Sequence, residues 1–329
     1  MKFVGTASLA AMILAGSWYA AHAQSAFGPS NSKETYYWIS QNSTLPLFVR
    51  SDYKGMKKIA DQLHIRIRIA GPTNIDLGQL IATIGEVCAQ RPAGISVVGW
   101  DPALTVPVQQ CVAMHVPVVV DDADLPGSGR LAFIGTDWHT IGDEQAKAII
   151  KALPNGGKIA VLSIVNADNM KQAVEGLTKT LKAAGKKYQI VASEDDTGDA
   201  ATASRVASSV IAAHRDIAAI AGFDSESGPG IVEAVREAGM KGKIVVTAME
   251  QSPDFFKTLL EGSTTAIIVQ NRELFTYYAF RLLYDFHHNG LSTNGLTGWR
   301  GKPIPVDVNT GVLVVTKDNV GPMLKAAAK

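Results

Sequence analysis

Short apolar runs rich in β-branched residues alternate along the chain with longer amphipathic segments. The short runs have the pattern of buried strands, and the longer segments have the period of helices that cover a sheet. This alternation predicts parallel sheets with helices on both faces. The expected strands are residues 36–40, 65–69, 94–98, 117–120, 131–134, 158–163, 188–192, 217–221, 243–247 and 265–269. The expected helices are residues 48–63, 77–90, 106–115, 141–153, 169–184, 199–213, 229–239, 253–261 and 272–288.

The alternation begins twice along the chain. A Pro-Asn-Gly-Gly break at residues 154–157 separates two series of similar order, at about 34–136 and 140–269. After a Gly/Thr/Asn-rich loop at 289–297, residues 303–315 contain two short strand-like runs, and we expect them to cross back between the two series. The predicted fold class is therefore α/β, with two doubly wound parallel-sheet lobes.

The first residues have the pattern of an export signal. Lys2 supplies the positive charge, residues 3–16 are mostly apolar, and Ala21 and Ala23 flank His22 in an A-x-A cleavage site. The apolar run is too short to span a bilayer, and no later segment approaches a membrane span. We expect residues 1–23 to be removed and the mature protein to be soluble and exported, the alternative being a buried N-terminal helix.

The charge balance argues against a nucleic-acid partner. The chain has 31 Lys and Arg against 30 Asp and Glu, and removal of the signal takes away Lys2. A neutral chain without a helix-turn-helix is not expected to bind DNA or RNA.

Cys88 and Cys111 are the two cysteines of the chain. They fall in successive predicted helices and would reach an oxidising compartment, so they form either one disulfide or two separately buried thiols. Their spacing does not suit zinc, and the adjacent pair His287 and His288 lacks a third ligand nearby. We expect no metal and no cofactor.

Several short segments in a fixed order carry a resemblance to a known family. They are residues 39–48, 117–122, 134–137, 174–177, 220–224, 244–253 and 268–270, followed by the tail 309–318. Over nearly the whole mature length the chain resembles the ribose-type periplasmic solute-binding proteins, which feed ABC importers.

The resemblance implies a type I periplasmic-binding-protein fold, in which three crossing strands join the lobes around a ligand cleft. The crossings would lie near Thr136, Gln270 and Asn309. The N-terminal lobe would comprise 34–136 plus 271–297, and the C-terminal lobe 137–270 plus 309–329. The resemblance also implies a function: the protein would bind a small molecule and deliver it to a membrane permease complex. It would act as a monomer and would not be an enzyme.

Candidate ligand contacts follow from the strand order, because ligands of open parallel sheets bind outside the carboxyl ends of the strands. Polar planar side chains and aromatic rings are interleaved at these positions. Carboxylates and amides pair with neighbouring hydroxyls, while aromatic faces cover the C–H side of a ring. The sequence therefore predicts a sugar or polyol as the ligand. The expected ligand-binding residues are Gln41, Asn42, Phe48, Trp100, Asp101, Asp122, Asp124, Trp138, Asn169, Asp224, Glu250 and Gln270.

The chain departs from the ribose-type pattern where relatives have arginines, with Ala123 after the fourth strand and Ala173 in a later helix. Carboxylates buried without a positive partner are costly, so a ligand that carries an amine, such as an amino sugar, would offset them. Alternatively, these carboxylates face solvent or cap helices. The carboxylates in question are Asp122, Asp124, Asp224 and Glu250.

Two other functions remain open from the sequence. A receptor that presents a sugar-like signal to a chemoreceptor would share this fold. An exported enzyme acting on carbohydrate could use two cleft carboxylates as an acid/base pair. A transport defect would separate the first from an importer component, and turnover of a sugar would reveal the second.

Overall fold

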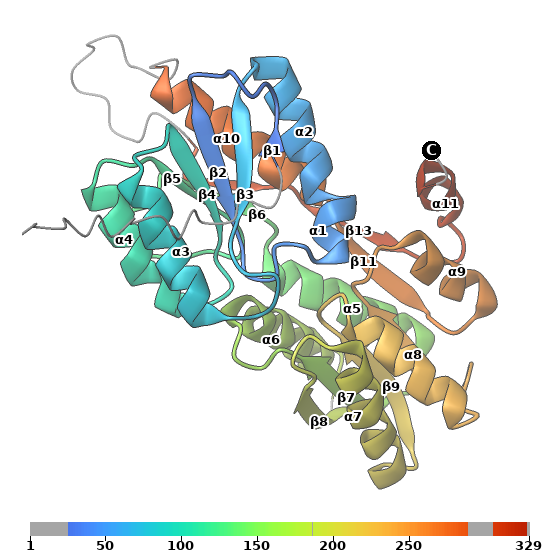
Figure 1. Ribbon diagram of the computed structural model, residues 1–329. Coiled ribbons are helices and arrows are strands. Elements are labelled where there is room, and N and C mark those ends of the chain that lie inside the picture. Colours follow the sequence, from blue (N-terminus) through green and yellow to red (C-terminus); the bar gives the residue numbers. More distant parts are fainter. Residues whose placement is uncertain (1–25, 186, 289–304, 328–329) are drawn as a thin grey trace, which may run out of the picture.

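The computed structural model describes residues 26–185, 187–288 and 305–327 and consists of two α/β lobes (Figure 1). The first lobe is built on a sheet of order β1-β3-β2-β4-β5-β6-β12, parallel except for the edge pair β1–β3. Its strands are β1 Ala26–Phe27, β2 Thr35–Ile39, β3 Arg66–Ala70, β4 Gly94–Val98, β5 Val118–Asp122, β6 Ala132–Gly135 and β12 Asp307–Asn309.

The second lobe is built on a sheet of order β13-β11-β10-β9-β7-β8. Only the β11–β13 pair is antiparallel in this sheet, as the structure describes it. Its strands are β7 Gly157–Ser163, β8 Tyr188–Asp195, β9 Ile217–Gly222, β10 Val245–Ala248, β11 Ala266–Gln270 and β13 Val312–Val315. The α/β fold class predicted from the sequence is confirmed.

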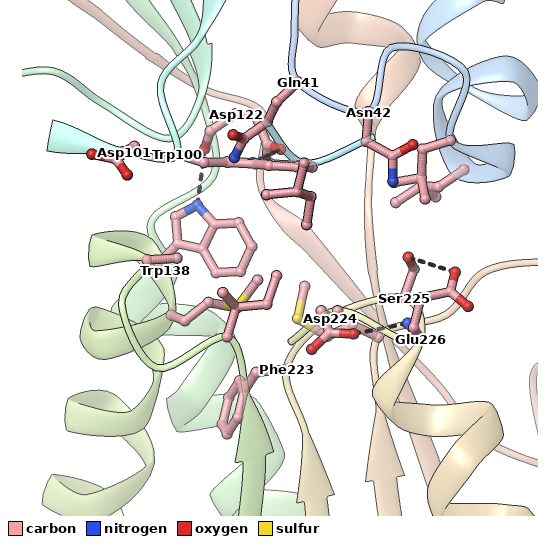
Figure 2. A pocket seen from close by; sticks show the side chains of 18 of the residues that line it. Gln41, Asn42, Trp100, Asp101, Asp122, Trp138, Phe223, Asp224, Ser225 and Glu226 are labelled. Atoms are coloured by element: carbon pink, nitrogen blue, oxygen red, sulfur yellow. Dashed lines mark hydrogen bonds between the residues drawn. The ribbon is translucent and has the colours of Figure 1, made fainter. Parts of the chain in front are cut away.

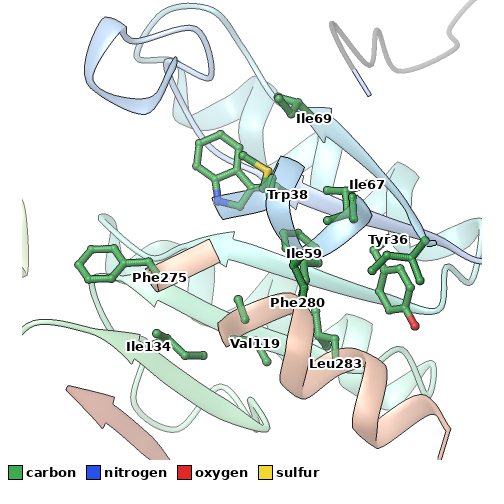
Figure 3. Close-up of a cluster of buried hydrophobic side chains, with 14 of the residues drawn as sticks. Tyr36, Trp38, Ile59, Ile67, Ile69, Val119, Ile134, Phe275, Phe280 and Leu283 are labelled. Atoms are coloured by element: carbon green, nitrogen blue, oxygen red, sulfur yellow. The ribbon is translucent and has the colours of Figure 1, made fainter. Parts of the chain in front are cut away.

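Helices cover both faces of each sheet, which explains why β4 and β5 are buried along their whole length. On the first sheet, α2 Asp52–Leu63 and α10 Arg272–His287 pack over one face, and Figure 3 shows the core that they form with β2, β3 and β5. The opposite face carries α3 Leu77–Ala89 and α4 Thr105–Ala113.

On the second sheet, α5 Trp138–Ala152 and α6 Asp168–Ala183 cover one face. A Cβ atom at Gly142 would lie 1.7 Å from the carbonyl oxygen of Ala173, so only glycine permits this approach of α5 to α6. The other face carries α7 Ala200–Ala213 and α8 Ser227–Glu237. Beside them, α9 Pro253–Glu261 and α11 Gly321–Ala327 pack over β11 and β13.

The chain passes between the two sheets at three places. It leaves β6 of the first sheet for α5, returns from β11 to α10, and leaves again from β12 to β13. The first and third passages touch, because the Thr310 amide donates to the Gly135 carbonyl at 2.9 Å. Two of the three connections between the sheets are therefore bonded to each other.

A few expected elements differ from the structure. The helix expected at 48–63 is interrupted at Ser51, and α1 Pro46–Arg50 precedes α2. A turn of 3-10 helix, Pro102–Leu104, precedes α4. The short elements β1 and α11 were not expected, because two and seven residues are too few to show a period. The predicted signal 1–23 and the loop 289–297 lie outside the described residues.

Within the part of the chain that is described, no helix has the length and apolar character needed to cross a bilayer.

Candidate ligand-binding cleft

A cavity of about 260 Å³ lies between the lobes, at the carboxyl ends of strands from both sheets (Figure 2). This volume lies near the lower limit for small-molecule sites and suits one small ligand. The cavity brings together most of the residues expected from the strand order. Those that line it are Gln41, Asn42, Trp100, Asp101, Asp122, Trp138, Asp224 and Gln270.

Asp122, the last residue of β5, organises the first-lobe wall. The indole N–H of Trp100 donates to its Oδ2 at 2.7 Å, and Nη1 of Arg272 lies 3.0 Å from its Oδ1. Its backbone carbonyl accepts a hydrogen bond of 2.9 Å from the indole N–H of Trp138, the first residue of α5. Asp122 thus fixes aromatic rings from both lobes beside the cavity (Figure 2).

Arg272 is the central residue that sequence reasoning missed. It begins α10, directly after the crossing, and its guanidinium donates to both carboxylate oxygens of Asp52 at 2.9 and 3.0 Å. Burial tends to lower the pKa of Arg272, but the charges of Asp122 and Asp52 outweigh burial and raise it. Burial raises the pKa of Asp52 to about 6, although Arg272 acts against this rise. A buried arginine held between two carboxylates therefore underlies the cavity wall.

Gln270, the last residue of β11, offers an unused donor at the cavity. It is buried, and its Oε1 accepts a hydrogen bond of 3.4 Å from Arg272 Nη1. Among the described residues, none accepts a hydrogen bond from its Nε2. Since buried amides are normally hydrogen-bonded, this unpaired Nε2 is a candidate donor to a ligand oxygen.

Four expected contacts lie elsewhere. Phe48 is fully buried behind Trp100, with ring centroids 5.4 Å apart. Asp124 pairs with Arg130 and lines a second cavity, together with the buried Asn169. Glu250 faces Arg50, and their charged atoms are 2.8 Å apart. The second cavity lies on the other side of Trp138, which lines both.

The premise of unpaired cleft carboxylates was wrong for three of the four residues. Asp122, Asp124 and Glu250 each have an arginine partner. These arginines belong to α10, to the loop before β6 and to α1, whereas the sequence argument considered only the positions next to the family pattern. The case for an amine on the ligand therefore loses most of its support.

Two contacts join the lobes next to this cavity. The Arg50 guanidinium in α1 donates to Glu250 after β10, and Gln251 Nε2 donates to Ser51 Oγ at 3.2 Å. Both pairs connect segments of the first lobe to the loop that follows β10, so they hold the lobes together beside the cavity.

Comparison with known proteins identifies the family. Residues 36–288 match the model of the family described as periplasmic binding protein domain. The chain belongs to this family. It is 25% identical over 248 residues to the D-allose-binding periplasmic protein of Escherichia coli strain K12. The matched region covers 72% of this chain and 79% of that protein.

Solved structures of sugar-binding relatives have the same fold as this periplasmic binding protein. The sugar-binding protein of a sugar ABC transporter from Bacillus halodurans has a TM-score of 0.79 and 27% identity, over 88% of this chain and 100% of that chain. A solute-binding protein of an ABC transporter from Burkholderia graminis, in complex with D-arabinose, has a TM-score of 0.79 and 26% identity, over 88% of this chain and 97% of that chain.

An acidic pair supports the second-lobe side of the cleft in this periplasmic binding protein. Ser227 Oγ lies 2.5 Å from Oδ2 of both Asp196 and Asp224. One hydroxyl proton cannot serve two carboxylates, so one contact needs a carboxyl proton. Burial raises the pKa of Asp196 to about 7, and the charge of Asp224 adds to the rise. Asp224 Oδ1 accepts the backbone N–H groups of Glu226 and Ser227, so Asp196 is the carboxyl that holds the proton.

We expect the free energy of unfolding to fall as pH rises from about 4 to about 7. Asp196 takes up its proton near pH 7 when folded but near 3.8 when unfolded, so the folded state binds more protons in this window. Asp52 and Asp121, whose pKa values burial raises to about 6 and about 7, act in the same direction. Urea denaturation at pH 5 and pH 8 measures the slope.

The Asp196→Asn variant keeps a donor for Ser227 Oγ without a titratable group. We expect it to be more stable than the wild type at pH 8, and to show a smaller change of stability with pH. Asp195→Asn, at the exposed neighbouring position, is the matched control. An unchanged slope in Asp196→Asn would mean that this carboxyl is already ionised in the folded protein.

Proposed function

We propose that the protein binds a monosaccharide or polyol in the inter-lobe cavity and delivers it to the permease of an ABC importer. The observation that carries the proposal is the cavity between the lobes, where Gln270 Nε2 is unpaired and Trp100 and Trp138 supply apolar surface. An amide donor and carboxylate acceptors suit hydroxyl groups, and aromatic faces suit the C–H side of a sugar ring. The sugar-binding relatives support the same ligand class.

Closure of the lobes around the ligand would give the permease a signal of occupancy. A ligand that contacts both lobes stabilises the closed form, because only that form provides all of its contacts. We place the lobe boundaries at 34–136 plus 271–297 and at 137–270 plus 309–329. Export through the signal 1–23 would place the protein in the periplasm as a monomer.

Absence of enzymatic activity is part of the proposal. Asp122 is paired with Arg272, and both oxygens of Asp224 accept hydrogen bonds, so neither carboxylate is free to act as an acid or base. The homologous proteins named above are binding proteins. Incubation of the purified protein with sugars, followed by product analysis, tests this point, and any turnover would contradict it.

A thermal-shift screen of the mature protein against pentoses, hexoses, polyols, inositols and amino sugars tests the ligand class. A ligand that binds only the folded form raises the melting temperature, and calorimetry then gives its affinity. Absence of a shift with every neutral sugar and polyol would overturn the proposal.

We expect Gln270→Leu to weaken binding of the sugar found in this screen about tenfold, the value of one hydrogen bond. The substitution keeps the approximate side-chain volume and removes the amide that has no protein partner at Nε2. Gln172→Leu, which removes an amide at the second cavity, is the matched control. Equal affinities of the two variants would show that Gln270 does not contact the ligand.

A further inference from the structure

The walls of the cleft differ in polarity. Side chains at the ends of β2, β5 and β11, namely Gln41, Asp122 and Gln270, give it carboxylate and amide groups. On the second lobe the residue that follows β7 is Ile164, and the residue that follows β10 is Met249. Two strand-end positions of the second lobe, after β7 and β10, are therefore apolar where sheets usually present polar ligand contacts, whereas Gln270 at the end of β11 is polar.

Four residues that line the cavity form an apolar corner. They are Trp138, Ile164, Ala167 and Met170. They belong to one apolar cluster, in which Trp138, Ala167 and Met170 are at most 8% exposed and Ile164 packs against them. Asn166, the polar cavity residue between Ile164 and Ala167, is exposed to solvent. The buried polar side chain of this stretch, Asn169, lines the second cavity and not this one, so the corner itself presents mainly carbon and sulfur to the ligand.

The polar groups of the second lobe gather at the other side of the cleft. Asp224, Ser225 and Glu226 lie together at the start of α8, facing Asn42 (Figure 2). The Asp224 carboxylate is occupied by backbone N–H groups and by Ser227. None of these groups lies in the apolar corner.

A fully hydroxylated hexose would have to place a polar edge against this corner. A hydroxyl group there loses its water without gaining a protein partner, whereas a methyl or methylene group is favoured. We propose that the cavity selects a deoxy or methyl-bearing sugar. Its hydroxylated edge faces Asp122 and Gln270, and its apolar edge faces the corner. This inference rests on the proposed function and narrows its ligand class.

Matched sugar pairs that differ by one hydroxyl group test the inference. Calorimetry on the mature protein compares D-galactose with D-fucose, L-mannose with L-rhamnose, and D-glucose with D-quinovose. In each pair with measurable affinity, the deoxy sugar should bind at least about tenfold more tightly than the hydroxylated sugar. Tenfold is the lower end of the discrimination that one apolar group gives in a hydrophobic pocket. Equal or tighter binding of the hydroxylated member overturns the inference and leaves the proposed function standing. If none of these sugars binds while a pentose or polyol binds in the thermal-shift screen, the inference fails and the proposed function stands. If nothing in that screen binds, both fail.

Met170→Gln supplies the corner with an amide of similar length. The ratio of affinities between the members of a pair should then shift about tenfold or more toward the hydroxylated sugar, since the amide can bond its additional hydroxyl. Met240→Gln is the control, because Met240 lies in the same lobe against a different cluster. This ratio does not depend on the fraction of folded variant. An unchanged ratio in Met170→Gln would overturn the assignment of the corner.

Discussion

Replacing Arg272 with alanine is expected to lower the free energy of unfolding by about 3–5 kcal/mol, the usual cost of breaking a buried ion pair. The guanidinium is 2% exposed and lies between Asp52 and Asp122, which are equally buried. Its removal leaves two buried carboxylates without a positive partner. Urea denaturation at pH 7 measures the loss. We also expect sugar binding to weaken, because Arg272 holds the wall that contains Asp122 and Gln270.

Arg281→Ala is the matched control for this prediction. Arg281 lies in the same helix and pairs with Asp285 at 2.8 Å, but its side chain is 47% exposed. Exposed pairs contribute about 0.2–1 kcal/mol, so the control should lose much less stability. Similar losses in the two variants would contradict a special role for the buried pair.

A second substitution separates the charge effect from lost packing. The Arg272 guanidinium also lies 5.1 Å from the ring centroids of Phe48 and Phe275. If stranded charge dominates, Asp52→Asn in the Arg272→Ala background should recover part of the lost stability, because one buried carboxylate is then neutral. No recovery would indicate that packing on the aromatic rings dominates.

Much of the fold could be predicted because its strands are short apolar runs between polar breaks. The expected strand 94–98 and the expected helix 253–261 coincide with β4 and α9. The break of a long helix at Ser51 escaped prediction, since the residues on either side keep an amphipathic pattern. The small elements β1 and α11 depend on contacts with β3 and α9, which local sequence does not specify.

The candidate site was predictable only as far as it follows strand ends. Gln41 and Asp122 lie just after or at the end of strands of the first sheet, and Gln270 ends a strand of the second sheet. They meet because the carboxyl ends of the parallel strands of both sheets face the same cavity. The arginine partners could not be inferred in this way. Asp52 and Arg272 are 220 residues apart, and Arg50 and Glu250 are 200 apart. Such pairs depend on how helices from different parts of the chain pack, and the sequence therefore overstated the unpaired acidity of the cleft.

The disulfide also depended on helix packing, which the sequence left open. Cys88 in α3 and Cys111 in α4 are bonded, with their Cα atoms 5.4 Å apart, so the alternative of two separate thiols was wrong. Both residues are fully buried in the core between these helices and the first sheet. The bond therefore fixes α3 to α4 on the sheet face opposite α2 and α10.

Replacing both cysteines with alanine is expected to cost about 3 kcal/mol of stability. The bond closes a loop across 23 residues, and in the chain-entropy model such a loop restricts the unfolded chain by about this amount. The loss should be largest in the first lobe, because both cysteines belong to its core. Amide hydrogen exchange locates it, and urea denaturation gives its size. The wild type treated with a reductant should approach the stability of the double variant.

Ligand binding should survive the loss of this disulfide. Measuring affinity in the double variant therefore distinguishes a role of the bond in stability from a role in the ligand site. The cavity contacts α3 at its first residue, Leu77, whereas Cys88 lies near the opposite end of that helix. The double variant should therefore bind the sugar found in the screen with an affinity within about twofold of the wild type at a temperature where both are folded. Reductant should leave its melting temperature unchanged, because no other cysteines exist in the chain. A large loss of affinity in the folded double variant would show that the position of α3 helps to form the cleft, and that the bond acts on function as well as on stability.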